Sequence, residues 1–315
     1  MAIKFRNVSF KYNPLDKKVL DDITFDIESN DEFIFIVGQT GSGKSTLVQN
    51  MNVLLKPTSG QIFSFNRKII IKYNTILVLN TKKNRKKYDL PNNKGIFQKY
   101  KKPIYAKNLK QIRQNVGLVF QFPEYQLFES TVLKDVMFGP LNFGYTKEEA
   151  YRLAVNALKL VKIDESLFDK SPFSLSGGQM RKIAIAGTIA CNPKVLILDE
   201  PTAGLDPNSK YSLMNELVRI QDETRKSIII ISHDMNLVGA FARRVMVMSK
   251  GKLVYDGKKE SLFNNNELLK QYNLNLPDIS NFAVKLKEAG LIRYNNIPLD
   301  KETLKEIILR GEPRE

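Results

Sequence analysis

The chain of 315 residues contains one cysteine, one histidine and no tryptophan. The single cysteine, Cys191, allows no internal disulfide and no thiolate cluster around zinc, so the simplest compartment is a reducing one. Long apolar runs are also missing, because FIFIV at 33–37 and IIII at 228–231 fall far short of the roughly 18 residues that span a bilayer. The N-terminus, MAIKFRNVSF, lacks the residue order of a secretory signal, so we expect no cleavage there.

Acidic residues are scarce in one segment. Between Arg67 and Arg113 there are fifteen Lys or Arg and one acid, Asp89, so this stretch holds +14 of the formal net charge of +16. A basic protein often binds nucleic acid or anionic lipid. Here, however, the charge describes one segment, and the rest of the chain is nearly neutral.

Hydrophobic residues make up 43% of the chain, enough for one large packed domain with a smaller one beside it. The runs IKFRNVSF, ITFDI and FIFIV read as strands, and the last leads through a glycine loop into a helix, STLVQNMNVLL, which we expect Pro57 to end. The runs VLILD at 195–199 and SIIIIS at 227–232 are typical of buried parallel strands. The sequence predicts an α/β fold with an antiparallel part near the N-terminus.

Three segments depart from this alternation. Residues 66–108 are rich in Lys and Asn, and we expect them to form a largely mobile insertion. Residues 122–185 are predicted to form a helical subdomain, in which TKEE at 146–149 indicates a capping box. Short amphipathic helices follow Gly257, so the chain is expected to divide into domains at 1–258 and 259–315.

The segment GQTGSGKST matches G-x-x-x-x-G-K-[ST] between a predicted strand and a predicted helix, the context that a phosphate-binding P-loop requires. Glycines let backbone N–H groups close around phosphates, Lys44 neutralises phosphate charge, and the Ser45 hydroxyl binds Mg²⁺. The candidate nucleotide-binding residues are Gly38, Gln39, Thr40, Gly41, Ser42, Gly43, Lys44, Ser45 and Thr46.

Polar residues follow three other predicted strands. Asp199 ends the strand VLILD, where it can bind Mg²⁺, and Glu200 follows, where it can polarise an attacking water; two such acids can also be solvated loop residues. His233 stands where ligands gather in parallel sheets and can contact a γ-phosphate, although a lone histidine is commonly structural. The Gln121 amide can touch both Mg²⁺ and water.

Two further features bear on nucleotide binding. Tyr12 lies just beyond the strand VSF, where its ring can stack on a base, although packing is the ordinary role of such an aromatic. The segment FSLSGGQMRKIAIAG at 173–187 places Gly177 and Gly178 at the start of a predicted helix, which is a second seat for phosphate. One nucleotide does not need two cradles in the same chain.

In this order along the chain, the motifs resemble the set found in ABC ATPases: GQTGSGKST at 38–46, Gln121, LSGGQ at 175–179, VLILDEP at 195–201, AGLD at 203–206 and His233. In that family two cassettes face head to tail, and each LSGGQ closes over the ATP on the other subunit's P-loop. The resemblance implies a P-loop cassette with a RecA-like parallel sheet, an N-terminal antiparallel β subdomain and a helical subdomain, followed by a small C-terminal helical domain.

The resemblance also implies the ligands, ATP and Mg²⁺, and a role for each matching residue. The catalytic group comprises Glu200 as general base, His233 and Gln121; Tyr12 stacks on adenine; and the Mg²⁺ site comprises Ser45, Gln121 and Asp199. The signature residues that face the partner's ATP are Ser176, Gly177, Gly178 and Gln179, and Asp206 belongs to the D-loop.

The runs VGLVFQFPEYQLFESTVLKDVMFGPLNFGYTKEEA and LSGGQMRKIAIAGTIA are similar to the ATPases of energy-coupling factor transporters, in particular the second of their two ATPase subunits. The similarity covers residues 1–65 and 109–315. Such complexes pair two ATPases with a transmembrane coupling protein and a small membrane protein that binds a vitamin or a metal ion. The resemblance therefore implies a peripheral protein at the cytoplasmic face of the cell membrane. Residues 259–315 would help to hold the ATPases together, and Phe122–Ser130 would line the groove for the coupling protein.

Two other functions share these motifs. The ATPase of a cobalt or nickel importer, paired with itself, differs only in its partners. A soluble ABC ATPase acting on nucleic acid or the ribosome fits the basic insertion, but the sequence has no coiled-coil insertion, no tandem cassette and no zinc cysteines, so we expect no nucleic-acid partner. The insertion, longer and more basic than the family pattern, is interpreted as a solvated loop or as a contact for anionic lipid headgroups.

Overall fold

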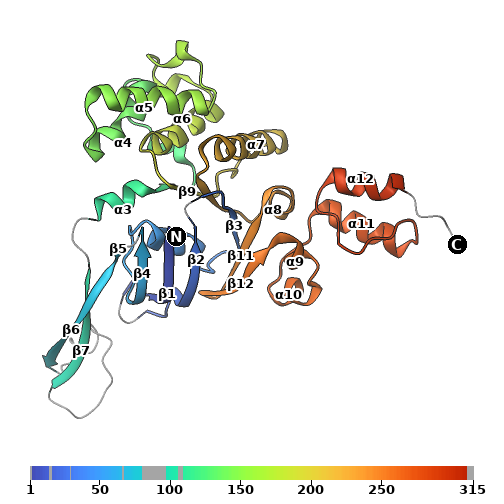
Figure 1. Ribbon diagram of the computed structural model, residues 1–315, viewed down its shortest axis with the longest axis horizontal. Helices are drawn as coiled ribbons and strands as arrows, with labels where there is room; N and C mark the ends of the chain where they lie inside the picture. The colour runs from blue at the N-terminus through green and yellow to red at the C-terminus, as the bar shows by residue number, and fades with distance from the viewer. Residues whose placement is uncertain are drawn as a thin grey trace.

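The computed structural model describes residues 2–13, 16–28, 30–65, 67–79, 97–105 and 109–310. In Figure 1 the helices α4–α6 gather at one end, a β-hairpin extends from the opposite end, and the last helices lie at a third corner. The strands are β1 (Ile3–Phe10), β2 (Leu20–Ile27), β3 (Phe33–Val37), β4 (Ser59–Ser64), β5 (Arg67–Lys68), β6 (Ile70–Leu79), β7 (Phe97–Tyr105), β8 (Val116–Val119), β9 (Val195–Asp199), β10 (Ser227–Ile231), β11 (Arg244–Ser249) and β12 (Lys252–Lys258). The helices are α1 (Lys44–Met51), α3 (Lys110–Asn115), α4 (Val132–Phe143), α5 (Lys147–Leu160), α6 (Gly177–Ala190), α7 (Pro207–Thr224), α8 (Met235–Phe241), α9 (Lys259–Phe263), α10 (Asn266–Gln271), α11 (Asp278–Glu288) and α12 (Lys301–Arg310).

The central sheet has the order β12-β11-β3-β10-β9-β8, and all its strands are parallel except β12. Every residue of β3, β9 and β10 is buried. Strands covered on both faces read as continuous apolar runs, which is why their sequences do not alternate. The predicted α/β class is confirmed.

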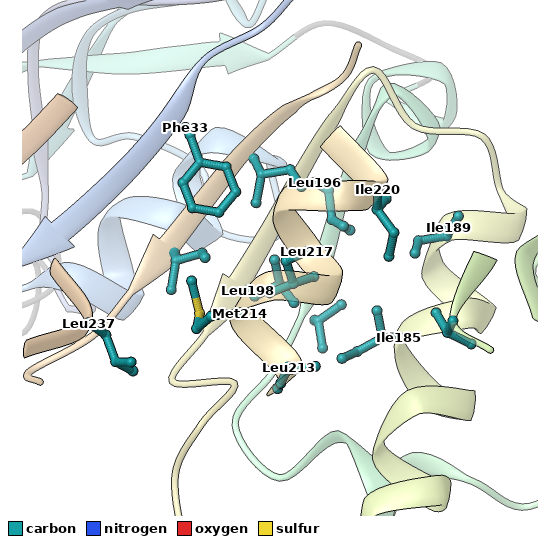
Figure 2. Close-up of a cluster of buried hydrophobic side chains, with 14 of the residues drawn as sticks. Phe33, Ile185, Ile189, Leu196, Leu198, Leu213, Met214, Leu217, Ile220 and Leu237 are labelled. Carbon is teal, nitrogen blue, oxygen red and sulfur yellow. The ribbon is translucent and has the colours of Figure 1, made fainter. Parts of the chain in front are cut away.

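Two cores lie on the two faces of this sheet. Phe33 and Phe35 of β3 belong to the core formed with the helices, whereas Ile34 and Ile36 belong to the core formed with α1 and the N-terminal strands. Figure 2 shows α7 packed on the first face, with Met214 and its neighbours close to strand residues. The period-two alternation of side chains thus divides one apolar run between two layers.

The N-terminal sheet is antiparallel, with the order β2-β1-β4-β5, as the sequence predicted. The helix α1 ends at Met51, well before the predicted stop at Pro57. A turn ends it, because the Asn52 side chain accepts a hydrogen bond from the Leu54 N–H at 2.9 Å and Val53 has a φ of 60°. The apolar residues after Met51 therefore form a turn and do not continue the helix.

The helical layer consists of α4, α5 and α6. At the start of α5 the Thr146 side chain accepts from the Glu149 N–H at 3.2 Å, and the Glu149 carboxylate accepts from the Thr146 N–H at 2.8 Å. The predicted capping box is confirmed. Gly139 of α4 lies so close to Cys191 that an added Cβ would come within 2.5 Å of its Sγ. The cysteine is therefore a buried packing residue.

The insertion differs from its prediction where the structure describes it. Residues 70–79 and 97–105 form a two-stranded antiparallel sheet with pairs from Ile70↔Tyr105 to Leu79↔Phe97. Figure 1 shows the hairpin extending away from the N-terminal sheet. The segment IIKYNTILVL is rich in β-branched residues, which favour strands. Residues 80–96 and 106–108, which hold much of the positive charge, lie outside the described part.

The C-terminal helices share the main core. Leu262, Phe263 and Leu269 pack in the same cluster as the central sheet, and a small separate cluster forms around Ala283 and Leu304. Gly239 of α8 approaches this region closely, because an added Cβ would come within 2.7 Å of a Pro277 carbon. Within the described part of the chain, no helix combines the length and the apolar character needed to cross a bilayer.

Candidate functional site

The carboxyl ends of four parallel strands meet at one edge of the central sheet. The register pairs Ile231 of β10 with both Ile36 of β3 and Asp199 of β9, and Val119 of β8 pairs with Leu198. The segments that follow these strands are the P-loop, the Glu200 turn, the His233 loop and the Gln121 loop. This edge is the usual ligand site of an open parallel sheet.

The P-loop is held by close backbone contacts that only glycine permits. Gly38 has a φ of 141°, and an added Cβ would come within 2.1 Å of the Met248 carbonyl oxygen. Gly43 has a φ of 101°, and its Cβ would lie 2.9 Å from the Val19 carbonyl. The Gly251 N–H donates to the Ser42 carbonyl at 3.0 Å. The N-terminal sheet and the β11–β12 turn therefore shape the loop before any ligand binds.

The cradle has free capacity for phosphate. The first N–H groups of α1 have no partner within the helix, and its dipole is positive at this end. The buried Ser42 hydroxyl has no hydrogen-bond partner among the described residues. The Lys44 ammonium donates to the carbonyls of Gly38 and Gln39 at 2.8 and 3.0 Å. A phosphate would give these donors a stronger acceptor.

Two carboxylates lie near this lysine. Burial lowers the pKa of Lys44, and the charges of Glu200 and Asp199 counteract part of that effect. Burial raises the pKa of Asp199, which the hydrogen bond from Ser45 opposes. A hydroxyl and one carboxylate suit Mg²⁺, which commonly takes one or two carboxylates together with phosphate oxygens. The described residues contain no group of three His, Cys, Asp or Glu that could hold a metal alone.

Glu200 and His233 are in direct contact. The Nδ1 of His233 lies 2.9 Å from the Oε1 of Glu200. The Glu200 side chain is 14% exposed, whereas that of His233 is 75% exposed. Glu200 has a φ of 49°, and its N–H donates to the Ile231 carbonyl at 3.1 Å. The turn after β9 is thus fixed by β10, and the histidine can orient the carboxylate.

Tyr12 lies beside the start of α1. Its hydroxyl is 3.1 Å from the Thr46 Oγ1, and its ring packs edge-on against Phe10 with centroids 5.0 Å apart. The side chain remains 57% exposed, so one ring face is open to a base. Gln121 is also exposed, in the loop after β8.

The signature segment begins α6 with a capping box. The Ser176 Oγ accepts from the Gln179 N–H at 3.3 Å, and the Gln179 Oε1 accepts from the Ser176 N–H at 3.0 Å. Gly177 and Gly178 are exposed, and a Cβ added at either would meet nothing within 4 Å. In the described chain, no hydrogen bond or ion pair joins residues 176–179 to the P-loop. Within the residues that the structure describes, no close contact requires glycine at either position.

Asp206 caps α7, accepting from the Ser209 N–H at 3.1 Å; the Ser209 side chain and, to a smaller extent, this backbone hydrogen bond lower the pKa of Asp206. One turn on, the Lys210 ammonium donates to Asp234 at 2.9 Å. Asp234 in turn caps α8 directly after His233. The segment that contains Asp206 is thereby tied to the histidine loop, a link that the sequence analysis missed because the two residues are far apart in the chain.

A second missed contact involves Arg181 on α6. Its guanidinium binds Glu124 of the Gln121 loop through two hydrogen bonds of 2.6 and 3.0 Å. The signal was present in the sequence, since Arg181 lies four residues before the buried Ile185 and so shares its helix face. A charged residue on a buried face needs a partner.

A P-loop, a carboxylate in contact with a histidine, and an exposed capped helix start are features of a nucleotide-binding cassette. Comparison with known proteins narrows the class. Residues 20–203 match the family described as ABC transporter. The chain is 41% identical over 313 residues to the energy-coupling factor transporter ATP-binding protein EcfA2 of Ligilactobacillus salivarius, covering 98% of this chain and 97% of that protein. It is 42% identical over 309 residues to EcfA2 of Caldanaerobacter subterraneus subsp. tengcongensis, covering 97% and 95%.

Solved structures agree with this assignment. CbiO1 of Clostridium perfringens, described as part of the ABC transporter complex CbiONQ, superposes with a TM-score of 0.67 and 34% identity over 90% of this chain and 98% of that one. The ATP-binding cassette MJ0796, solved as a dimer with ADP and Pi, gives 0.60 and 28% over 81% and 98%. The chain therefore belongs to the ABC transporter family, among the ATP-binding proteins of energy-coupling factor transporters.

Proposed function

We propose that this chain hydrolyses ATP at the cytoplasmic face of the cell membrane to power the uptake of a vitamin or another micronutrient through an energy-coupling factor transporter. The observation that carries the proposal is the exposed start of α6 at Ser176–Gly178, which no hydrogen bond or ion pair joins to the P-loop among the described residues. A motor whose ATP site is completed only by a neighbour can convert ATP binding into movement of two subunits. The relatives named as transporter subunits support the same reading.

The pairing follows from what each surface offers. The P-loop surrounds phosphates from one side, while the start of α6 supplies the Ser176 hydroxyl, two backbone N–H groups and a positive helix dipole. Placed head to tail, two cassettes would enclose each ATP between a P-loop and a signature segment. That enclosure excludes water and positions the γ-phosphate, which supplies most of the catalysis in phosphoryl transfer. The ATP-binding cassette MJ0796 has been solved as a dimer bound to ADP and Pi, which supports pairing of two cassettes.

The residues around the sheet edge then have separate roles in ATP binding and hydrolysis. Glu200 accepts the proton of the attacking water, and His233 holds its carboxylate and contacts the γ-phosphate. Lys44 neutralises phosphate charge, Tyr12 stacks on adenine, and Gln121 reaches the attacking water from the loop after β8. Mg²⁺, held by Ser45, Gln121 and Asp199, would supply charge neutralisation for the phosphates.

The surface beside the Gln121 loop fits a membrane partner. Phe122, Tyr125 and Phe128 are 37%, 84% and 56% exposed, which is unusual for large aromatics unless a partner covers them. An adjoining apolar groove of about 820 Å³ lies between α4 and α5. Its apolar lining consists of Leu133, Met137, Phe138, Leu141 and Tyr151. We propose that a transmembrane coupling protein docks here.

The second candidate is the ATPase of a cobalt or nickel importer that pairs with itself, as the motifs alone also allow; the likeness to CbiO1, part of the ABC transporter complex CbiONQ, shows that this fold occurs in another transporter complex. The two candidates differ in partners. Isolation of the chain from its native membrane in mild detergent, with identification of the co-purifying proteins, separates them. We expect a second ATP-binding cassette, a polytopic membrane protein and a small substrate-binding membrane protein. Recovery of membrane proteins with this chain as the only ATP-binding cassette supports the second candidate. Recovery with ribosomes or RNA contradicts both candidates.

A complementation experiment tests the pairing. Lys44→Met removes the P-loop charge, and Gly178→Glu places a bulky negative side chain on the exposed start of α6, where an added Cβ meets nothing within 4 Å among the described residues. In the self-paired complex that the second candidate requires, each variant alone should be inactive, and an equal mixture should regain about a quarter of normal turnover, because half of the dimers are mixed and each holds one intact site of its two. In the pair with a second cassette, Lys44→Met should remove the site at this chain's P-loop, and Gly178→Glu should remove the site at the partner's P-loop. A self-paired mixture with no recovery, or a Gly178→Glu variant that leaves the partner's site active, contradicts the shared site.

A further inference from the structure

One guanidinium connects three segments of the ATP site. Arg181 lies one turn after Gly178 on α6, and its side chain is 6% exposed. It donates two hydrogen bonds to the Glu124 carboxylate. It also donates to the carbonyls of Pro201 and Ala203 at 3.1 and 2.8 Å. The fork of an arginine fits this arrangement, since one edge faces a carboxylate while the remaining nitrogen reaches backbone oxygens.

Each contacted segment carries a residue of the ATP site. Glu124 lies in the 3₁₀ turn at Pro123–Gln126, three residues after Gln121. Pro201 directly follows Glu200, and Ala203 begins the AGLD segment. Arg181 therefore contacts the neighbours of two proposed site residues while it stands on the helix whose first turn forms the signature seat.

The backbone at both places needs support. Phe122 has a φ of 54° and Glu200 a φ of 49°, a region that residues with side chains adopt only when the surroundings hold them there. The guanidinium also lies over the Phe122 ring, 6.0 Å from its centroid. The hydrogen bonds from Arg181 thus fall beside both strained turns, and a shift of α6 would be transmitted to them.

We propose that Arg181 is a positioning residue that couples the signature seat to Gln121 and Glu200 of the same chain, so that ATP bound by the neighbouring cassette aligns this chain's own catalytic loops. The proposal rests on the proposed function, because it requires the start of α6 to contact the partner's nucleotide. A purely structural staple would show the same contacts, so the test must separate turnover from stability.

The test uses the purified transporter complex. Arg181→Lys keeps the charge but lacks the fork, and we expect kcat to fall about 10- to 100-fold, the scale of a small misplacement of reacting groups. The KM for ATP and the affinity for a fluorescent ATP analogue should change less than about threefold, because the P-loop is untouched. Arg219→Lys is the matched control, since Arg219 pairs with Glu223 one turn along α7 and should keep normal turnover.

A double variant guards against simple unfolding. Arg181→Met with Glu124→Met replaces the buried ion pair by apolar side chains, a change that commonly preserves stability. We expect a thermal unfolding midpoint near that of the parent with kcat still low and cooperativity in ATP lost. Normal kcat in the folded double variant, or activity losses that only follow the unfolded fraction, would overturn the coupling. The proposed function itself is contradicted if the unmodified complex does not hydrolyse ATP, or if the unmodified chain hydrolyses ATP equally well without a second cassette.

Discussion

The substitution Glu200→Gln tests the proposed general base with little disturbance of the structure. Glutamine has the shape of glutamate, and its amide oxygen can still accept from the His233 Nδ1, now 2.9 Å from the Glu200 Oε1. The strained turn persists as well, because the bond from the Glu200 N–H to Ile231 is a backbone bond. Of the functions of this side chain, only proton acceptance and the negative charge are lost.

The size of the effect follows from that loss. A general base contributes about 10² to 10⁴ in rate, which corresponds to about 2.7–5.4 kcal/mol of transition-state stabilisation. ATP affinity should stay the same or rise, since one negative charge leaves the neighbourhood of Lys44 and the γ-phosphate. The assay is phosphate release by the complex at saturating ATP, together with binding of a fluorescent ATP analogue.

A matched control is available on the helical layer. Glu165 pairs with Lys159 and is 67% exposed, so Glu165→Gln makes the same chemical change away from the site and should leave turnover intact. The reasoning fails if Glu200→Gln turns over ATP at the parent rate. It fails equally if ATP binding is lost together with turnover, because the side chain would then serve binding and not proton transfer.

Three further outcomes are expected. Tyr12→Ala should weaken ATP binding about tenfold, the scale of one base stacked on an aromatic ring, whereas Tyr12→Phe, which loses only the hydroxyl contact with Thr46, should bind nearly as the parent does; equal losses measured with a fluorescent ATP analogue would refute stacking. Replacing residues 70–105 by an Asn-Gly turn should spare ATP hydrolysis, because the paired ends of the hairpin lie about 5 Å apart and a short turn can join them; a dead or unfolded variant would show that the hairpin is structural. Burial alone would raise the pKa of Glu124, but hydrogen bonds from Arg181 hold it below the ordinary value of 4.5. A carboxyl whose pKa is lowered by folding contributes stability that is fully present above the unfolded-state pKa and is lost as the pH falls through the folded-state pKa. Glu124→Gln should therefore unfold with a weaker pH dependence below about pH 4.5, measured by circular dichroism.

The local elements that could be predicted are those whose signal is contained in a short window. Continuous apolar runs identified β3, β9 and β10 because both faces of these strands are covered. The P-loop was equally predictable, because its glycines Gly38 and Gly43 stand where the backbone has a positive φ and lies too close to other backbone atoms for a side chain. The end of α1 was misplaced, because Asn52 stops the helix through a side-chain bond that competes with a longer apolar pattern.

Features that depend on long-range packing were beyond a reading of the sequence. The pair Arg181 and Glu124 spans 57 residues: the helix face of Arg181 signals that it needs a partner, but nothing in the sequence identifies Glu124 as that partner. The hairpin was not predicted, because the lysines dominate the composition of the insertion and indicate a solvated loop. The β-branched residues of IIKYNTILVL, which favour a strand, were given too little weight. The site roles of Gln121 and Tyr12 remain predictions, since they concern a ligand and not the fold.

The start of α6 gives a physical argument for the proposal that one cassette does not complete its own ATP site. Two glycines in the first turn of a helix make it less stable than alanines would, because glycine loses more backbone entropy on folding; among the described residues, a Cβ added at either position would meet nothing within 4 Å. The capping box of Ser176 and Gln179 offsets part of that cost, since an N-cap contributes about 1 kcal/mol. The helix start is thus kept ordered while its surface is kept bare. An ordered helix start without side chains lets another molecule approach its backbone N–H groups, and the positive end of a helix suits a phosphate. This is the physical argument for the proposal that the α6 start contacts the ATP of a neighbouring cassette.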